Sequence, residues 1–224
     1  MSGRASARRS RLAGGLYWFT VDALAGHLRR NGHRFRRIRV RDLEIEVDVT
    51  DATGLYPYFY GDPYERAVTD ALVTALRPGD AFIDIGANIG YFSTLGALVV
   101  GTAGRVVSFE PHPDARAALQ AMAERNGVAA VIEIVPVALA EREGDLTLYT
   151  SGDATVYSTL DPANSPMREV VAFLPGTLTR VLTLDGWYTG GRNWRPGFAP
   201  SRSTSREPRR ACWRAWPKRW RANC

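Results

Sequence analysis

One short stretch of the chain, residues 82–92, combines an acidic side chain with a glycine-rich turn. An apolar run ends at Asp84, and Gly86 and Gly90 then precede a helix-like segment. A second apolar run, residues 106–109, ends at another acid, Glu110. Glycines allow the backbone to approach a ligand closely, and a carboxylate accepts hydrogen bonds from sugar hydroxyls. These residues predict a pocket for a nucleotide-type cofactor at the ends of two strands.

The glycine spacing favours S-adenosylmethionine over a dinucleotide as that cofactor. A G-x-G-x-x-G fingerprint counted from Gly86 needs glycine where this chain has Asn88 and Tyr91. Adenosylmethionine carries a sulfonium and no phosphate, so a carboxylate such as Asp84 would attract it but would repel a pyrophosphate. The motif alone also permits a buried strand-to-helix turn with a capping acid and no ligand.

The surrounding pattern predicts the elements that position these residues. Strands are expected at 81–85, 105–109 and 131–135, with helices at 90–100 and 113–126 between them. This alternation predicts a parallel sheet in an α/β fold. Upstream, we expect a β-hairpin of 37–40 and 43–49, an aromatic loop at 56–60 and a helix at 64–76. Downstream, we expect short strands at 146–149, 170–173 and 179–183, and an open loop at 152–168.

Basic charge is concentrated at the two ends of the 224-residue chain. The formal net charge is +6, but residues 192–224 hold ten Arg or Lys and one acid. The other residues carry 19 basic and 22 acidic side chains, a net charge of −3, and eleven of those arginines lie within residues 1–41. A nucleic-acid function would therefore rest on the ends of the chain and not on its core.

Other sequence features bear on location. Cys212 and Cys224 both lie in the basic C-terminal segment, so they indicate little about a redox compartment. The sequence has no apolar run near the roughly 20 residues that a membrane span needs, and no pattern typical of a signal peptide. From these features we expect a cytoplasmic protein.

Further motifs resemble those of FkbM-type S-adenosylmethionine-dependent methyltransferases. The resemblance covers residues 38–198 and rests on eight segments: Tyr64-Glu65, Gly79-Asp80, residues 84–91, residues 109–113, Asn126, residues 137–139, Ser158 and residues 181–185. It implies a class I Rossmann-like methyltransferase fold, here preceded by the β-hairpin as an extension. It also implies methyl transfer from S-adenosylmethionine to a hydroxyl of a small-molecule acceptor, a sugar or a secondary metabolite.

The residues at the predicted site receive individual roles from the motif and the resemblance. Asp84, Gly86, Asn88 and Gly90 would shape the site for the methionine end of the cofactor, Ala87 and Tyr91 would line it, and Glu110 would bind the ribose. His112 is expected to be a loop residue and not a catalytic base, whereas Asp185 suits either a functional acid or a cap. The residues identify no catalytic base, and no His/Cys cluster has the spacing of a metal site.

The C-terminal segment departs from the resembled family, whose members continue after the Thr-Leu-Asp segment with a further strand. Residues 200–208 can be encoded by codons that read Val-Glu-Val-Asp-Val-Glu-Gly-Ala in a shifted frame, which resembles that missing strand. We therefore expect three parts: a basic arm (1–37), a partial methyltransferase domain incomplete at its C-terminus (38–198) and a basic tail that reads as out of frame (199–224).

Three classes of function follow from the sequence. The first is an S-adenosylmethionine-dependent methyltransferase, with no nucleic-acid partner and no membrane span. The second is an inactive truncated remnant of such an enzyme. The third is a nucleic-acid- or membrane-binding protein that acts through its Arg-rich ends.

Overall fold

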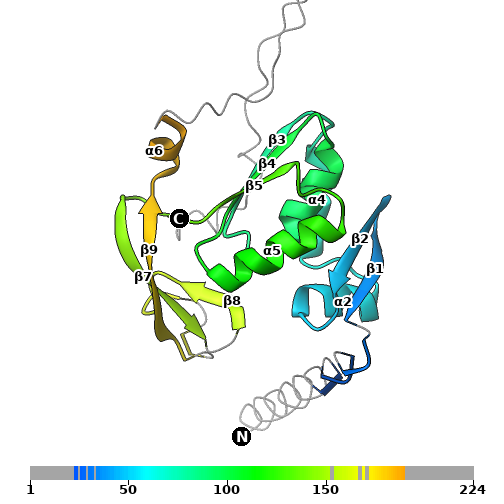
Figure 1. The fold of residues 1–224 in the computed structure, drawn as a ribbon, viewed down its shortest axis with the longest axis horizontal. Helices are drawn as coiled ribbons and strands as arrows, with labels where there is room; N and C mark the ends of the chain where they lie inside the picture. The colour runs from blue at the N-terminus through cyan, green and yellow to red at the C-terminus, as the bar shows by residue number, and fades with distance from the viewer. Residues whose placement is uncertain are drawn as a thin grey trace, which may run out of the picture. The chain divides into compact units, whose positions relative to one another are not determined.

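The computed structural model describes residues 23–24, 26–28, 30–32, 34–151, 154–165, 168–169 and 172–189 (Figure 1). The chain divides into two compact units, residues 1–66 and residues 67–224. Most of the expected N-terminal arm and all of the tail 199–224 lie outside the described residues. Of the helices described, none has the length and apolarity to cross a membrane.

The first unit contains the predicted β-hairpin. Strands β1 (Phe35–Val40) and β2 (Leu43–Asp48) pair antiparallel around a turn in which Arg41 has a φ of 53°. Alternate side chains of the two strands face inward, and Val40, Ile45 and Val47 are almost completely buried. The period of two in the sequence is therefore the period of the pleat, and the predicted hairpin is confirmed.

The predicted aromatic loop at 56–60 is wrong, because these residues belong to helix α2 (Ala52–Tyr60). Asp51 caps the helix by accepting the backbone N–H of Thr53 at 2.8 Å, and Gly61 ends it with a φ of 72°. Pro57 lacks the N–H that would otherwise bond to the carbonyl of Thr53. The two caps satisfy groups at both ends of the helix and compensate for that missing bond.

The second unit contains the predicted α/β core. Its parallel sheet has the order β3-β4-β5, formed by Ala81–Ile85, Arg105–Phe109 and Ile132–Val135. Helix α3 (Arg66–Ala75) precedes the sheet, and helices α4 (Tyr91–Val100) and α5 (Pro113–Arg125) connect its strands. Two consecutive parallel crossovers define a Rossmann-like α/β unit, so the predicted fold class is confirmed.

The two faces of this sheet pack against different parts of the chain. On one face, Val106 joins Ala97 and Val100 of α4 and Ala123 of α5 in a buried cluster. On the other face, Val107, Phe109 and Val135 pack with Trp187. Neighbouring residues of one strand therefore face different surroundings, which fixes the strand register at the site described below.

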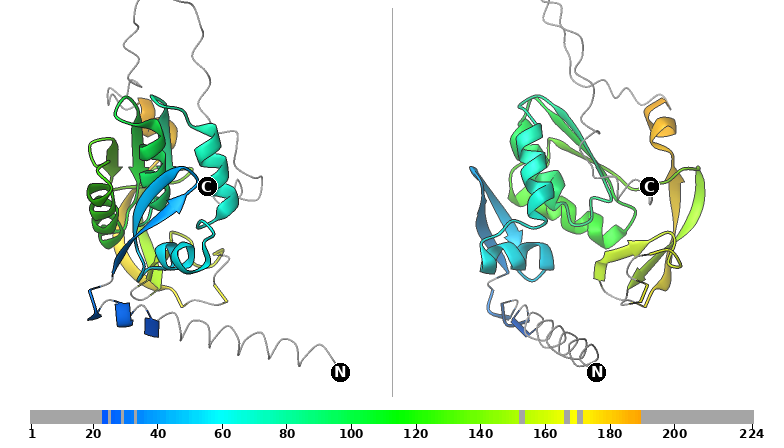
Figure 2. Two further views of the ribbon diagram at one scale, coloured as in Figure 1. Left: turned by 90° about the vertical axis from the view of Figure 1, so that its right-hand side faces the viewer. Right: turned by 180° about the vertical axis from the view of Figure 1, so that it is seen from behind.

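A second, four-stranded sheet of the same unit was not expected as a separate structure (Figure 2). Its order is β6-β9-β7-β8, from Ala138–Leu139, Leu174–Leu182, Gly144–Ser151 and Ala154–Thr159. Strand β9 runs parallel to β6 and antiparallel to β7. Helix α6 (Leu184–Thr189) follows β9.

Two predictions in this region are wrong. The expected loop at 152–168 contains strand β8, which pairs antiparallel with β7, with Thr159 opposite Tyr149 and Ala154 opposite Ser151. A strand was also expected at 170–173. Residues 172–173, the described part of that range, are not in a strand, because pairing with β7 begins only at Leu174. Gly, Ser and Asp residues on either side of β8 concealed it in the sequence.

Candidate functional site

The glycine loop, residues 86–90, lies at the carboxyl end of β3, where the sequence predicts the cofactor site. Gly86 and Gly90 have φ values of 74° and 87°, and Asn88 also has a positive φ, of 49°. Asn is one of the few residues with a side chain that visits this left-handed region readily. The loop therefore contains three left-handed residues before α4 begins.

The first three amide groups of the loop are all bonded to the end of β4. The N–H groups of Gly86 and Ala87 donate to the carbonyl oxygen of Phe109 at 2.9 and 3.0 Å. The N–H of Asn88 donates to Glu110 Oε2 at 2.8 Å. A loop that cradles phosphate directs its amides outward to the ligand. Here these three amides bind the neighbouring strand and its carboxylate, so they are not directed outward as donors to a pyrophosphate.

Glu110 is the buried acid at the end of β4 and is only 5% exposed. Its second oxygen, Oε1, accepts the backbone N–H of His112 at 2.8 Å. Burial raises the pKa of Glu110, and the bonds from His112 and Asn88 oppose that rise. A carboxylate has about four lone-pair positions, so two neutral donors can still bind beside these amides. Ribose hydroxyls are donors of this kind.

Asp84 is the second buried acid and is 8% exposed. Its register partner on β4 is Ser108, and Ser93 of α4 lies over both. Ser93 Oγ donates to Asp84 Oδ2 at 2.6 Å and lies 2.8 Å from Ser108 Oγ. Burial, together with repulsion from Glu110, raises the pKa of Asp84 to about 6. In the described part of the chain, no ion pair compensates the charge of Asp84, so a cationic ligand would stabilise it.

The remaining predicted site residues surround the start of α4. Gly90 is the N-cap of α4 and faces α5, because a Cβ built on it would lie 2.6 Å from Leu119 Cγ. Gly86 faces open space. A Cβ built on it would have no protein atom within 4 Å, apart from its neighbours in the chain. Ala87 and Tyr91 are 6% and 3% exposed and pack inside the fold. The structure thus brings the predicted residues of both strand ends together around one loop.

Several residues of this region carry functions that the sequence did not predict. His112 Nδ1 caps α5 by accepting the N–H of Asp114 at 3.2 Å, and Arg116 bonds to the carbonyl oxygens of Glu110 and Pro111. Ser93 and Ser108 were also missed. The available signal was Ser93-Thr94 in a helix without charged residues, and Ser108 within the apolar run at the end of β4.

Asp185 lies exposed in the first turn of α6. The cap of that helix is provided by Thr183, whose hydroxyl accepts the N–H of Gly186 at 2.9 Å. The sequence left open whether Asp185 is a functional acid or a cap. The described contacts assign the capping bond to Thr183 and not to Asp185. In the ranges that the structure describes, no group of three or more His, Cys, Asp or Glu side chains is arranged to hold a metal ion.

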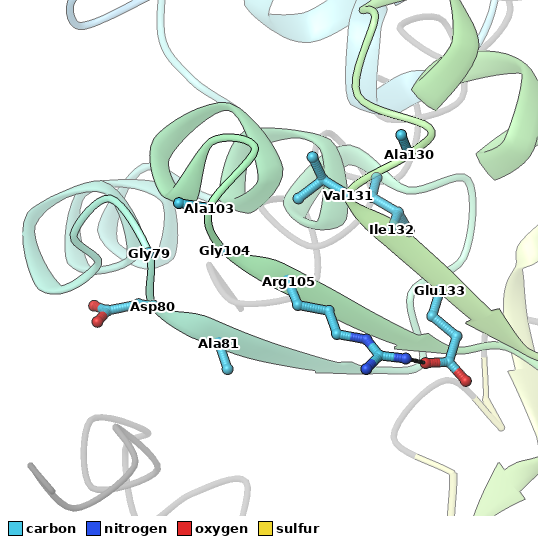
Figure 3. Close-up of a pocket in the computed structure, with 10 residues that line it drawn as sticks. All are labelled: Gly79, Asp80, Ala81, Ala103, Gly104, Arg105, Ala130, Val131, Ile132 and Glu133. Carbon is cyan, nitrogen blue, oxygen red and sulfur yellow. Dashed lines mark hydrogen bonds and ion pairs between the residues drawn. The ribbon is translucent and has the colours of Figure 1, made fainter. Parts of the chain in front are cut away.

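A hollow of about 350 Å³ lies at the opposite, amino end of the three parallel strands (Figure 3). Arg105 and Glu133 form an ion pair along its floor and point to the same side of the sheet as Ala81. Ligands of open α/β sheets bind beyond the carboxyl ends of the strands. The hollow is therefore distinct from the glycine loop and is not the predicted site.

Comparison with known proteins finds a similar domain. Residues 84–190 match the methyltransferase FkbM domain. A similar curated protein is the 31-O-demethyl-FK506 methyltransferase FkbM of Streptomyces tacrolimicus, 38% identical over 114 residues, which are 51% of this chain and 40% of that protein. The chain thus matches less than half the length of this relative.

Solved structures give weaker similarities. An S-adenosylmethionine-dependent O-methyltransferase of Thermotoga maritima is 12% identical with a TM-score of 0.32, over 54% of this chain and 58% of its own. A protein-L-isoaspartate O-methyltransferase is 21% identical with a TM-score of 0.25, over 43% and 26%. These scores are too low to argue from, so the fold assignment rests on strand order and register. The domain match and the curated relative thus agree that residues 84–190 of this chain are similar to the FkbM methyltransferase domain.

Proposed function

We propose that this chain is an S-adenosylmethionine-dependent O-methyltransferase. The observation that carries the proposal is the Glu110–Asn88 bond together with the two bonds to the carbonyl of Phe109. These bonds use the loop amides that a phosphate would need, and they place a carboxylate where a phosphate would be repelled. A cofactor with hydroxyls and a cationic centre suits this arrangement, and the match of residues 84–190 to the methyltransferase FkbM domain supports the same choice.

The described residues fit adenosylmethionine in three respects. Glu110 offers carboxylate lone pairs to the ribose hydroxyls, while its two amide bonds hold it in place. The open space beside Gly86 admits a ligand against bare backbone. Asp84 supplies a buried negative charge for the cationic end of the methionine group. When bound, the cofactor would supply an activated methyl group on a sulfonium centre.

A hydroxyl-bearing small molecule, a sugar or a secondary metabolite, is the proposed acceptor. The FkbM protein of Streptomyces tacrolimicus is named for methylation of an oxygen of 31-O-demethyl-FK506. Transfer to oxygen requires the acceptor hydroxyl to lie in line with the methyl group. The acceptor would reach the methyl group at the carboxyl ends of β3 and β4, where the glycine loop begins.

Calorimetric titration of the full chain with S-adenosylmethionine tests the proposal. We expect one site per chain, and we expect Gly86→Asp to weaken binding by tenfold or more, because the new side chain fills the open space and adds a negative charge beside Glu110. Gly127→Asp is the matched control. Gly127 has a φ of 68° and equally open surroundings, but it follows α5 at the far end from the loop.

Both variants introduce the same side chain at a left-handed glycine, so their effects on folding should be similar. Equal affinity of Gly86→Asp and wild type would contradict the proposed site. A wild-type chain that is folded but binds neither adenosylmethionine nor adenosylhomocysteine would contradict the proposed function.

A further inference from the structure

Two buried hydroxyl groups form a chain that ends on Asp84. Ser93 lies on α4, Ser108 lies on β4, and both are completely buried. Ser93 Oγ lies 2.6 Å from Asp84 Oδ2 and 2.8 Å from Ser108 Oγ. The site thus joins a helix and two strands through polar groups, within a face that is otherwise apolar.

The number of protons gives this chain a direction. A serine hydroxyl has one proton to donate and lone pairs to accept. When Asp84 is ionised, it can only accept, so Ser93 must donate its proton to Asp84. The bond between the serines then requires Ser108 to donate to Ser93. Hydrogen bonds that point the same way strengthen one another, so Ser108 acts on Asp84 through Ser93.

The surroundings of Asp84 otherwise oppose its ionisation. Burial and the nearby charge of Glu110 raise its pKa to about 6, whereas the bonds from Ser93 lower it. Helix α4 contains no charged residue. The guanidinium of Arg116 on α5 bonds to the carbonyl oxygens of Glu110 and Pro111. Among the described groups around Asp84, the charged form is therefore stabilised by Ser93, through its hydroxyl first and its backbone N–H second.

We propose that Ser93 and Ser108 are positioning residues that keep Asp84 ionised at neutral pH and fixed in orientation toward a cationic ligand. The identity of that ligand rests on the proposed function, but the effect of the serines on Asp84 does not. The two serines act one through the other. Ser93 bonds to the carboxylate, and Ser108 fixes the direction in which Ser93 donates its proton.

Carboxyl carbon NMR of the cofactor-free full chain tests this directly by following the titration of Asp84. We expect Ser93→Ala to raise the midpoint by about one pH unit or more, which corresponds to the loss of one charge-assisted hydrogen bond. Ser108→Ala should raise it by less. The double variant should match Ser93→Ala alone, because Ser108 has no path to Asp84 once Ser93 is removed.

Thr94→Val is the matched control, because Thr94 is the next buried hydroxyl of α4 and its Oγ1 has no hydrogen-bond partner among the described residues. It should leave the midpoint of Asp84 unchanged. An unchanged midpoint in Ser93→Ala, or effects that add in the double variant, would overturn the proposal. If Ser93→Ala does not fold, Ser108→Ala decides alone, since an unchanged midpoint there excludes a chain acting through Ser93.

Calorimetry with S-adenosylmethionine then separates this inference from the proposed function. With both correct, Ser93→Ala loses affinity at a higher pH than wild type. Shifted midpoints without any cofactor binding would reject the function and keep the positioning role. Cofactor binding with unshifted midpoints would reject the positioning role and keep the function.

Discussion

The two acids of the site are held by different kinds of partner. Glu110 accepts backbone N–H groups from Asn88 and His112, so its position is set by the path of the chain. Asp84 accepts from the Ser93 hydroxyl and, more weakly, from the Ser93 backbone, so its stronger bond can be removed by one substitution that leaves the backbone bond in place. Glu110 therefore mainly holds the backbone of the loop in shape, whereas Asp84 mainly supplies a buried negative charge next to the loop.

At the residue scale, Asp84 makes stability depend on pH. Its ordinary pKa is 3.8, and the folded value is about 6, so the folded chain binds a proton more tightly than the unfolded chain. Ionised Asp84 therefore disfavours folding above pH 6, and this cost disappears as the pH falls from about 6 to about 4. The full effect is about 3 kcal/mol of free energy of unfolding as an upper bound.

Urea unfolding of wild type and Asp84→Asn at pH 7, 6, 5 and 4 measures this contribution. The variant is neutral throughout, so the stability of wild type relative to the variant should increase as the pH falls from 7 to 4. Carboxyl groups that do not interact with Asp84 cancel in the difference, which therefore reports Asp84 together with its repulsion from Glu110. A difference between the two proteins that stays constant over this range would contradict the prediction.

The chemistry of individual residues was predictable to the extent that it depends on spacing along the chain. The sequence identifies the two acids because each lies at the end of an apolar run. It identifies the glycines because they follow Asp84 within a few residues. Their partners were not predictable in this way. Ser108 meets Asp84 only through the parallel register of β3 and β4, and Ser93 meets both only through the packing of α4.

At the scale of elements, the contact between α4 and α5 depends on Gly90. We expect Gly90→Ala to lower the free energy of unfolding by about 2–5 kcal/mol, from left-handed backbone strain of about 1–2 and overpacking against Leu119 of about 1–3. Gly79→Ala is the control, because its φ of 86° matches the 87° of Gly90 while its surroundings are open. The difference between the variants in chemical unfolding measures the helix contact, and equal losses would mean that the contact has no energetic weight.

Elements with a strong local signal were predicted well, and those formed by distant pairing were not. The bounds of β3 and β4 match the apolar runs, since burial on both faces leaves a continuous apolar pattern. Strand β8 is held by pairing with β7, and its own pattern is interrupted by Ser and Thr. Helix α2 was missed because a proline and four aromatic residues resemble a loop, whereas its caps lie outside that segment.

At the scale of the whole molecule, the proposed site belongs to one of the two units. The glycine loop, Asp84 and Glu110 all lie within residues 67–224, and the hairpin β1–β2 lies within residues 1–66. Adenosylmethionine should therefore slow hydrogen exchange of backbone amides at 84–94 and 108–112 and leave the hairpin unchanged. Mass-detected exchange with and without the cofactor makes this comparison, and protection of the hairpin equal to that of the loop would contradict a site confined to the second unit.

The two bonds from the loop to the carbonyl of Phe109 also bear on how the site comes into being. Once β3 and β4 pair in register, Phe109 and Glu110 stand ready to bond the next three amides of the chain, so the same event that builds the sheet also folds the loop. The entropy of ordering residues 86–88 is then lost during folding and not during binding. An incoming cofactor would meet a preorganised loop, and its rate of association would reflect diffusion and docking without a step of loop ordering.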